Sequence, residues 1–120
     1  MKTNIYRGLK KDGTFTKGYL LSDSAIGTWG NQEYYTYAVI APETVGQYTG
    51  IKDKNSVEIF EGDILKTYSI DDGELIDIVA FENGSFVLTN PNKLSWHIGD
   101  YKSDYLEVIG NIHQNPDLKD

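Results

Sequence analysis

The chain has 120 residues, no cysteine, 39% hydrophobic residues and a net charge of −7, from 11 Lys and Arg against 18 Asp and Glu. The lack of cysteine excludes disulfides and thiolate metal sites, and no apolar run approaches the ~18 residues of a membrane-spanning helix. With Arg7 as its single arginine, the chain is not expected to bind duplex DNA tightly, because such binding relies on Lys and Arg that neutralise phosphates. We expect a soluble cytoplasmic protein without a membrane partner.

The first third of the chain predicts three strands. Two are expected over residues 4–9 and 14–21, separated by the turn Lys11-Asp12-Gly13. The third covers residues 34–40 and ends before Pro42, because proline cannot donate a hydrogen bond to a ladder. Residues 22–32 are rich in Ser, Gly and Asn and are expected to form a loop.

The first twenty residues are locally basic. They contain Lys2, Arg7, Lys10, Lys11 and Lys17, with Asp12 as the one acid. Such a hairpin could contact phosphates. The favoured interpretation is a solvated hairpin whose charges keep an edge strand soluble.

Residues 45–63 form the most informative segment. Alternation over 45–49 predicts a half-buried strand, and Gly50 permits a backbone conformation closed to other residues. Asp53 and Asn55 lie in a polar cluster where their side chains can hydrogen-bond the local backbone. A second strand over 57–60 and a turn over 61–63 lead into a further strand at 64–68.

The dipeptide Asn83-Gly84 predicts a two-residue hairpin of type I′, because both residues tolerate positive φ. The turn over 71–73 starts its first strand, residues 74–82, which we expect to be central in its sheet and covered on both faces. The hairpin fixes a register in which Phe81 faces Phe86, Ala80 faces Val87 and Val79 faces Leu88.

The last thirty residues are less regular. Asn90-Pro91 could begin a short helix through Trp96 that Gly99 ends. A final strand is expected over 108–112, followed by a helical turn or a frayed tail from Asn115.

Two motifs carry a family resemblance. The string VGQYTGIKDKNSVEIFEGDIL, residues 45–65, closely resembles the signature of the YopX family of phage and prophage proteins, and EVIGNIHQNPDL, residues 107–118, resembles its closing motif. Residues 6–13 and 18–21 are similar to the family's start. Ser56 departs from the pattern, which usually has glycine after the turn asparagine. The resemblance implies a small β-rich protein encoded by a phage or prophage, in a host cell, and it supplies no catalytic residues.

These patterns predict a mainly β fold with little helix, in one domain over residues 1–120. Short antiparallel strands and hairpins would form a partly open barrel or packed small sheets. A central β module would span about 44–90, with the C-terminal strand and tail over 107–120.

The sequence offers little catalytic or metal chemistry. A zinc site on His97 and His113 would need acidic ligands from distant segments. Asp71, Asp72 and Glu74 favour a turn over a cation site, and the pair Glu61 and Asp63 favours a turn with an exposed acidic rim over an acid–base pair. No catalytic residue, cofactor or metal ligand is assigned, and the binding residues are not identified.

Aromatic residues are the best candidates for a functional surface, since tyrosine offers large contact area with a polar tip. Tyr35 and Tyr37 would share one face of a strand and Tyr34 the other. The remaining candidates are spread along the chain: Trp29, Tyr48, Tyr68, Trp96, Tyr101 and Tyr105.

The favoured function is a non-enzymatic protein–protein binding or assembly module that forms homo-oligomers and contacts a host or phage protein. The first alternative is a nucleic-acid-associated accessory protein that uses the basic N-terminal hairpin. The least favoured is an enzyme with a dispersed Asp, Glu, Tyr and His site.

Overall fold

A computed structural model describes residues 5–28, 36–71, 73–90 and 93–119. The chain divides into two compact units, Met1–Tyr48 and Thr49–Asp120, which we call the N-terminal unit and the C-terminal unit. The single domain expected from the sequence, with its module at 44–90, stays a prediction.

Strands dominate the described residues, which hold eleven strands and four short 3₁₀ helices but no α-helix. The mainly β class with little helix is therefore confirmed. None of the described helices is long and apolar enough to cross a membrane. The strands are β1 (Tyr6–Leu9), β2 (Phe15–Ser22), β3 (Ala25–Thr28), β4 (Thr36–Val39), β5 (Gly46–Lys52), β6 (Glu58–Phe60), β7 (Asp63–Ser69), β8 (Gly73–Glu82), β9 (Ser85–Asn90), β10 (Lys93–His97) and β11 (Leu106–Asn111); the 3₁₀ helices are η1 (Pro42–Thr44), η2 (Ile98–Asp100), η3 (Ser103–Tyr105) and η4 (Pro116–Lys119).

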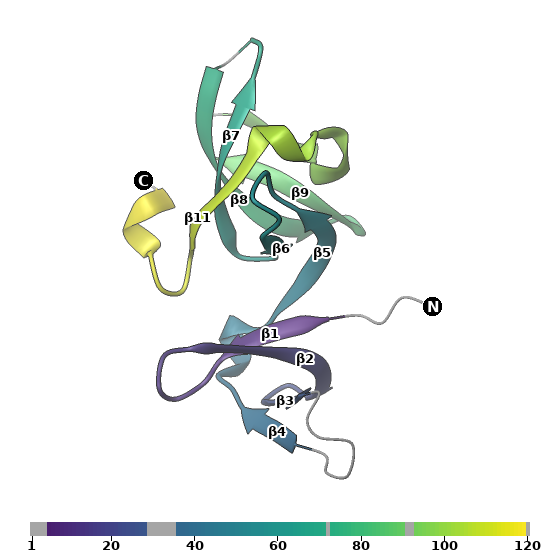
Figure 1. Ribbon diagram of the computed structural model, residues 1–120, viewed down its shortest axis with the longest axis vertical. Coiled ribbons are helices and arrows are strands. Elements are labelled where there is room, and N and C mark those ends of the chain that lie inside the picture. Colours follow the sequence, from purple (N-terminus) through teal and green to yellow (C-terminus); the bar gives the residue numbers. More distant parts are fainter. Residues whose placement is uncertain (1–4, 29–35, 72, 91–92, 120) are drawn as a thin grey trace. The chain divides into compact units, whose positions relative to one another are not determined.

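In the N-terminal unit the antiparallel strand order is β4-β3-β2-β1-β5 (Figure 1). β3 lies inside the segment 22–32, so the prediction of a loop there was wrong. Its residues Ala-Ile-Gly-Thr give a weak local strand signal, and pairing with both neighbours decides the conformation. A Cβ on Gly18 would collide with the Gly27 carbonyl, and one on Gly27 with the Tyr19 ring, so both glycines are needed for this close approach.

In the C-terminal unit the strand order is β10-β9-β8-β7-β11, again antiparallel (Figure 1). β8 is the central strand, as predicted. The register of the Asn83-Gly84 hairpin is also confirmed, with Phe81 opposite Phe86 and their rings edge to face at 5.0 Å. The short helix expected after residue 90 was wrong, because β10 pairs with β9 there and cross-strand contacts outweigh the local capping signal.

Neither sheet closes into a barrel, since each order of described strands has two ends. The described strands form two open antiparallel sheets. The chain passes from one unit to the other within β5, and β6 pairs with β5.

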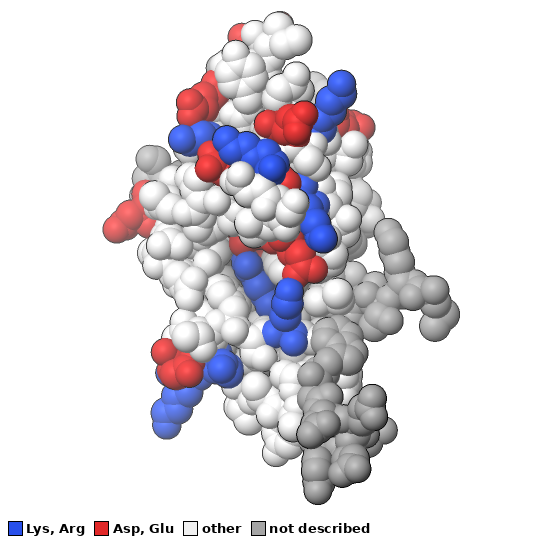
Figure 2. All heavy atoms as spheres, viewed as in Figure 1, with Lys and Arg blue, Asp and Glu red and all other residues white. Residues whose placement is uncertain are grey.

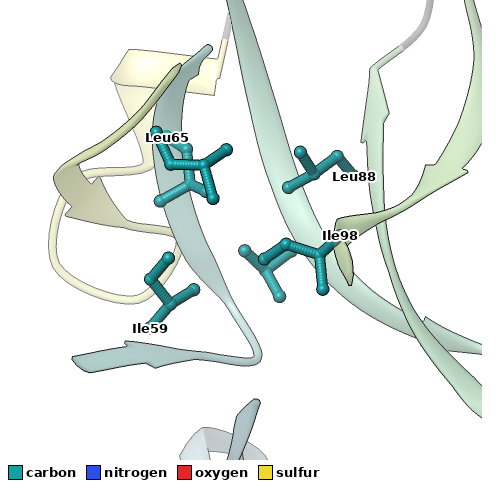
Figure 3. Close-up of a cluster of buried hydrophobic side chains, with 6 residues drawn as sticks. Ile59, Leu65, Leu88 and Ile98 are labelled. Atoms are coloured by element: carbon teal, nitrogen blue, oxygen red, sulfur yellow. The ribbon is translucent and has the colours of Figure 1, made fainter. Parts of the chain in front are cut away.

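The core of the C-terminal unit is apolar and almost fully buried. The strands β7, β8 and β9 supply Leu65, Val79 and Leu88, and β6 and η2 supply Ile59 and Ile98. Ile59, Leu65, Leu88 and Ile98 point toward one another (Figure 3). Burying each such side chain contributes about 1.5–3 kcal/mol. The opposite face of β8 is only partly covered, because Ile76 is exposed, so the predicted cover on both faces is confirmed only in part.

An acidic side chain of β8 lies on the core face of this sheet. Asp77 of β8 is fully buried and accepts hydrogen bonds from Thr67 Oγ1 at 2.8 Å and from Asn90 Nδ2 at 2.5 Å. The three residues come from neighbouring strands β7, β8 and β9. A buried carboxylate is costly unless it is hydrogen-bonded. The hydrogen bonds of Asp77 therefore favour the observed strand register over any register shifted along the strands.

The buried carboxylate of Asp53 joins two distant segments of the chain. Its Oδ1 accepts the backbone N–H groups of Asn55 and Val57, at 2.8 and 2.9 Å, and its Oδ2 accepts that of Val108 at 2.9 Å. The turn over residues 53–57 is thereby fixed against β11. The predicted role of Asp53 in the local turn is confirmed, and its hydrogen bond with Val108 connects the two motifs, residues 45–65 and 107–118.

Two further polar residues shape turns at the ends of strands. Asp63 is buried and accepts the Phe60 N–H at 2.7 Å, so the exposed acidic rim expected over 61–63 was wrong at this residue. Asn111 Oδ1 accepts the backbone N–H groups of His113 and Gln114 and starts the turn after β11.

Candidate functional site

The outer face of β7 supports the best candidate for a binding site. Along β7 the buried Leu65 and Thr67 alternate with the exposed Lys66 and Tyr68, as the period of two requires. The register places Glu74 of β8 opposite Tyr68. These side chains therefore project away from the core on neighbouring strands.

Tyr105 extends this surface from a different part of the chain. It ends η3, next to Leu106, which is fully buried in the core and fixes the position of the helix. The Tyr105 and Tyr68 ring centroids lie 6.1 Å apart with the planes tilted by 35°. The two residues are 45% and 53% exposed, so part of each remains open to solvent.

Charged side chains surround the two rings. Lys66 Nζ lies 3.2 Å from Glu74 Oε1, and Lys54 Nζ lies 3.5 Å from Glu107 Oε1. All four side chains are partly exposed, and such pairs are worth about 0–1 kcal/mol, so they can open at little cost. Asp104 adds a third carboxylate, for which no ion-pair partner is found within the described residues.

These residues line an open cavity of about 350 Å³ in the C-terminal unit, which we call the tyrosine groove. With two lysines and three acids among the residues that line it, the groove carries a net charge of −1. The described residues that line it are Lys54, Lys66, Thr67, Tyr68, Glu74, Asp104, Tyr105, Leu106 and Glu107.

The other aromatic candidates have mixed positions. Tyr37 on β4 and Trp96 on β10 are exposed, whereas Tyr101 packs against the core and Tyr48 is half-buried. Trp29, Tyr34 and Tyr35 lie outside the described residues. The sequence identified Tyr68 and Tyr105 as candidates but not their contact, because 37 residues separate them and no local pattern joins them.

The two histidines are not brought together as ligands. His97 Nδ1 lies 2.9 Å from Ser85 Oγ on the exposed ends of β10 and β9, and His113 lies beside Gly62 in the turn after β11. Within the described ranges, no three His, Asp or Glu side chains gather closely enough to hold a metal ion. The Ser85–His97 contact was missed from the sequence because β10 was not expected.

The acidic turn after β7 also differs from a cation site. Asp71 is exposed, Asp72 lies outside the described residues, and Glu74 pairs with Lys66 instead.

The basic N-terminal hairpin gathers little free charge. The Arg7 guanidinium lies over the Phe15 ring at 4.3 Å, and Lys10 Nζ lies 4.0 Å from Asp12. Hydrogen bonds from the hydroxyl and backbone N–H of Thr14 hold the pKa of Asp12 below its ordinary value. On the face drawn in Figure 2, blue and red side chains are interspersed and no continuous basic stripe crosses the described residues.

Comparison with known proteins gives one family and a similar fold. The family model described as YopX protein matches residues 8–119. No curated protein matches the sequence. The crystal structure of protein EF1440 from Enterococcus faecalis is similar over 100% of both chains, with a TM-score of 0.63 and 24% sequence identity. At that identity the likeness concerns the fold alone.

Proposed function

We propose that this chain, which belongs to the YopX family, is a non-enzymatic protein–protein binding and assembly module that self-associates. The observation that carries the proposal is the open edge of β4 in the N-terminal unit. The family membership supports a phage or prophage origin and a role in the host cytoplasm, where a host or phage protein would be the further partner.

The four sheet ends among the described strands differ in how they are protected. The edge of β11 is occupied by the 53–57 turn, because Asp53 Oδ2 accepts the Val108 N–H and Lys54 N–H donates to the Leu106 carbonyl. β6 has only three residues, and β10 is interrupted by a bulge. β4 is one residue longer than β6, its pairing with β3 has no bulge, and no turn among the described residues is hydrogen-bonded to its outer edge.

The side chains of β4 suit contact with a second copy. Its four residues, Thr36-Tyr37-Ala38-Val39, carry no charge. Tyr37 is 66% and Val39 67% exposed. An uncharged edge with exposed apolar side chains is a template for pairing with another strand, and two identical edges can pair antiparallel about a two-fold axis.

The distribution of charge favours association through the N-terminal unit. Residues 1–48 hold five Lys and Arg against four Asp and Glu, a net charge of +1, whereas residues 49–120 hold six against fourteen, a net charge of −8. Like charges on two copies repel. Contact between N-terminal units therefore meets much less repulsion than contact between C-terminal units.

Light scattering coupled to size-exclusion chromatography at ~10 μM tests the proposal. We expect a mass of about twice the 13.5 kDa monomer. Val39→Lys, which places a charge on the β4 edge, should give the monomer mass, and Ile70→Lys should not, although Ile70 is 94% exposed. Both variants should keep the far-UV circular dichroism of the wild type.

Two results would contradict this function. A monomer mass for the wild type over a wide concentration range would end the self-association proposal. A dimer that persists in folded Val39→Lys would remove β4 from the interface.

A further inference from the structure

We propose that the tyrosine groove of the C-terminal unit binds an arginine side chain of a partner protein. The inference deepens the proposed protein-binding function and rests on it, but it uses different residues from the β4 edge. It follows from the rings, the charge and the size of the groove.

The rings favour a cation over an uncharged ligand. Tyr68 and Tyr105 are each about half exposed, and the negative quadrupole of an aromatic ring face attracts a guanidinium or ammonium group. The planar guanidinium also stacks on an aromatic face, which the ammonium of lysine cannot do. Arginine is therefore the better fit.

The ring spacing says where the guanidinium would lie. A planar group between two rings needs about 7 Å, because each stacked layer takes ~3.5 Å. The centroids are 6.1 Å apart and the planes are tilted. The guanidinium would therefore stack on one of the rings and not between the two.

Asp104 supplies the carboxylate that would accept hydrogen bonds from the guanidinium. Glu74 and Glu107 each pair with a lysine, which leaves Asp104 as the carboxylate on which the acidic excess of the groove rests. Asp104 directly precedes Tyr105 in η3, so the acid and the ring line the same cavity. A carboxylate accepts the two parallel N–H groups of a guanidinium, which fixes its orientation.

The groove is open, as a site for a side chain from another protein must be. Its volume of about 350 Å³ is at the small end of ligand sites and suits a single long side chain. Lysine and glutamate pairs at the rim are exposed and weak, and they can exchange partners with a bound segment. An anion, in contrast, would meet a net negative lining.

Amide chemical-shift titration of the full, isotope-labelled chain tests this inference. The probes are blocked Gly-X-Gly peptides in which X is arginine, citrulline or glutamate, at up to ~10 mM, since a single side chain gives millimolar affinity. Citrulline keeps the shape of arginine without its charge. We expect the arginine peptide alone to shift the amides of residues 66–69 and 103–107.

Matched variants locate the interaction. Asp104→Asn and Tyr68→Leu should each weaken arginine binding by about two- to fivefold. Asp100→Asn removes the same charge from η2, outside the groove, and should bind as the wild type does. None of these variants should change the mass of the protein in solution, so a failure here is distinguishable from a failure of self-association.

Three results would overturn the inference. Equal shifts with citrulline would show that the cation is not recognised. Shifts confined to residues outside the groove would place the binding elsewhere. If inorganic phosphate changed the amide chemical shifts of Lys54 and Lys66 and the arginine peptide changed none, the groove would be an anion site in place of a cation site.

Discussion

Ser56 adopts the backbone conformation of a glycine. Its φ is 65°, in the left-handed region where a Cβ is crowded, and its N–H donates to the Asp53 carbonyl at 3.0 Å. The signature that residues 45–65 resemble usually has glycine at this position. The departure seen in the sequence therefore has a physical consequence, since the turn keeps its shape but carries local strain.

Replacing Ser56 with glycine should stabilise the protein by up to about 1 kcal/mol. The left-handed conformation costs a non-glycine residue roughly 1–2 kcal/mol, and the added flexibility of glycine in the unfolded chain returns part of that gain. The measurement is the urea midpoint and slope by circular dichroism.

Ser95→Gly is the matched control for this prediction. Ser95 is exposed within β10 and has no positive φ, so the same chemical change should lower the midpoint there. A midpoint for Ser56→Gly that equals or falls below the wild type would mean that the turn is not strained at Ser56.

At the scale of elements, the β8–β9 hairpin depends on two residues. Asn83 has φ 51° and Gly84 φ 84°, the pair of positive angles that defines a type I′ turn. The twist of this turn matches that of the flanking strands, so the register of the central strand follows from it.

Gly84→Val should destabilise the protein by about 1–3 kcal/mol, because a β-branched residue at positive φ is strained even where space is open. Gly99→Val is the control, since Gly99 also has open space around it but no positive φ. Urea denaturation of both variants separates backbone strain from the effect of size. Equal midpoints for the two variants would contradict the assigned turn.

Elements that a local turn specifies could be predicted from the sequence. Asn83-Gly84 and the 53–57 turn are examples, because each is fixed by residues within five positions of one another. β3 could not be predicted, since it depends on pairing with β2 and β4.

The tyrosine groove, like β3, could not be predicted from the sequence. Its two rings were recognisable as candidates, but their contact requires β7 and η3 to meet in the folded chain. Non-local pairing of this kind leaves no periodicity or spacing to detect.

For the whole molecule, the distribution of charge distinguishes self-association through β4 from binding of a partner in the tyrosine groove. The net charge of −7 opposes the approach of identical copies, and most of it resides in the C-terminal unit. The uncharged β4 edge and the acidic tyrosine groove should therefore respond to salt in opposite ways. Salt acts on both by shortening the screening length from ~10 Å at 0.1 M to ~3 Å at 1 M.

Raising sodium chloride from about 0.05 to 0.5 M should tighten self-association or leave it unchanged, because screening removes repulsion and an apolar contact loses nothing. The same change should weaken binding of the arginine peptide, because screening reduces the attraction between its cation and the acidic lining. Light scattering and chemical-shift titration measure the two affinities on one sample series. Val39→Lys should stay monomeric at every salt concentration. A dimer that dissociates as salt rises would mean that opposite charges hold the copies together, and the interface would then have to include charged residues that β4 lacks.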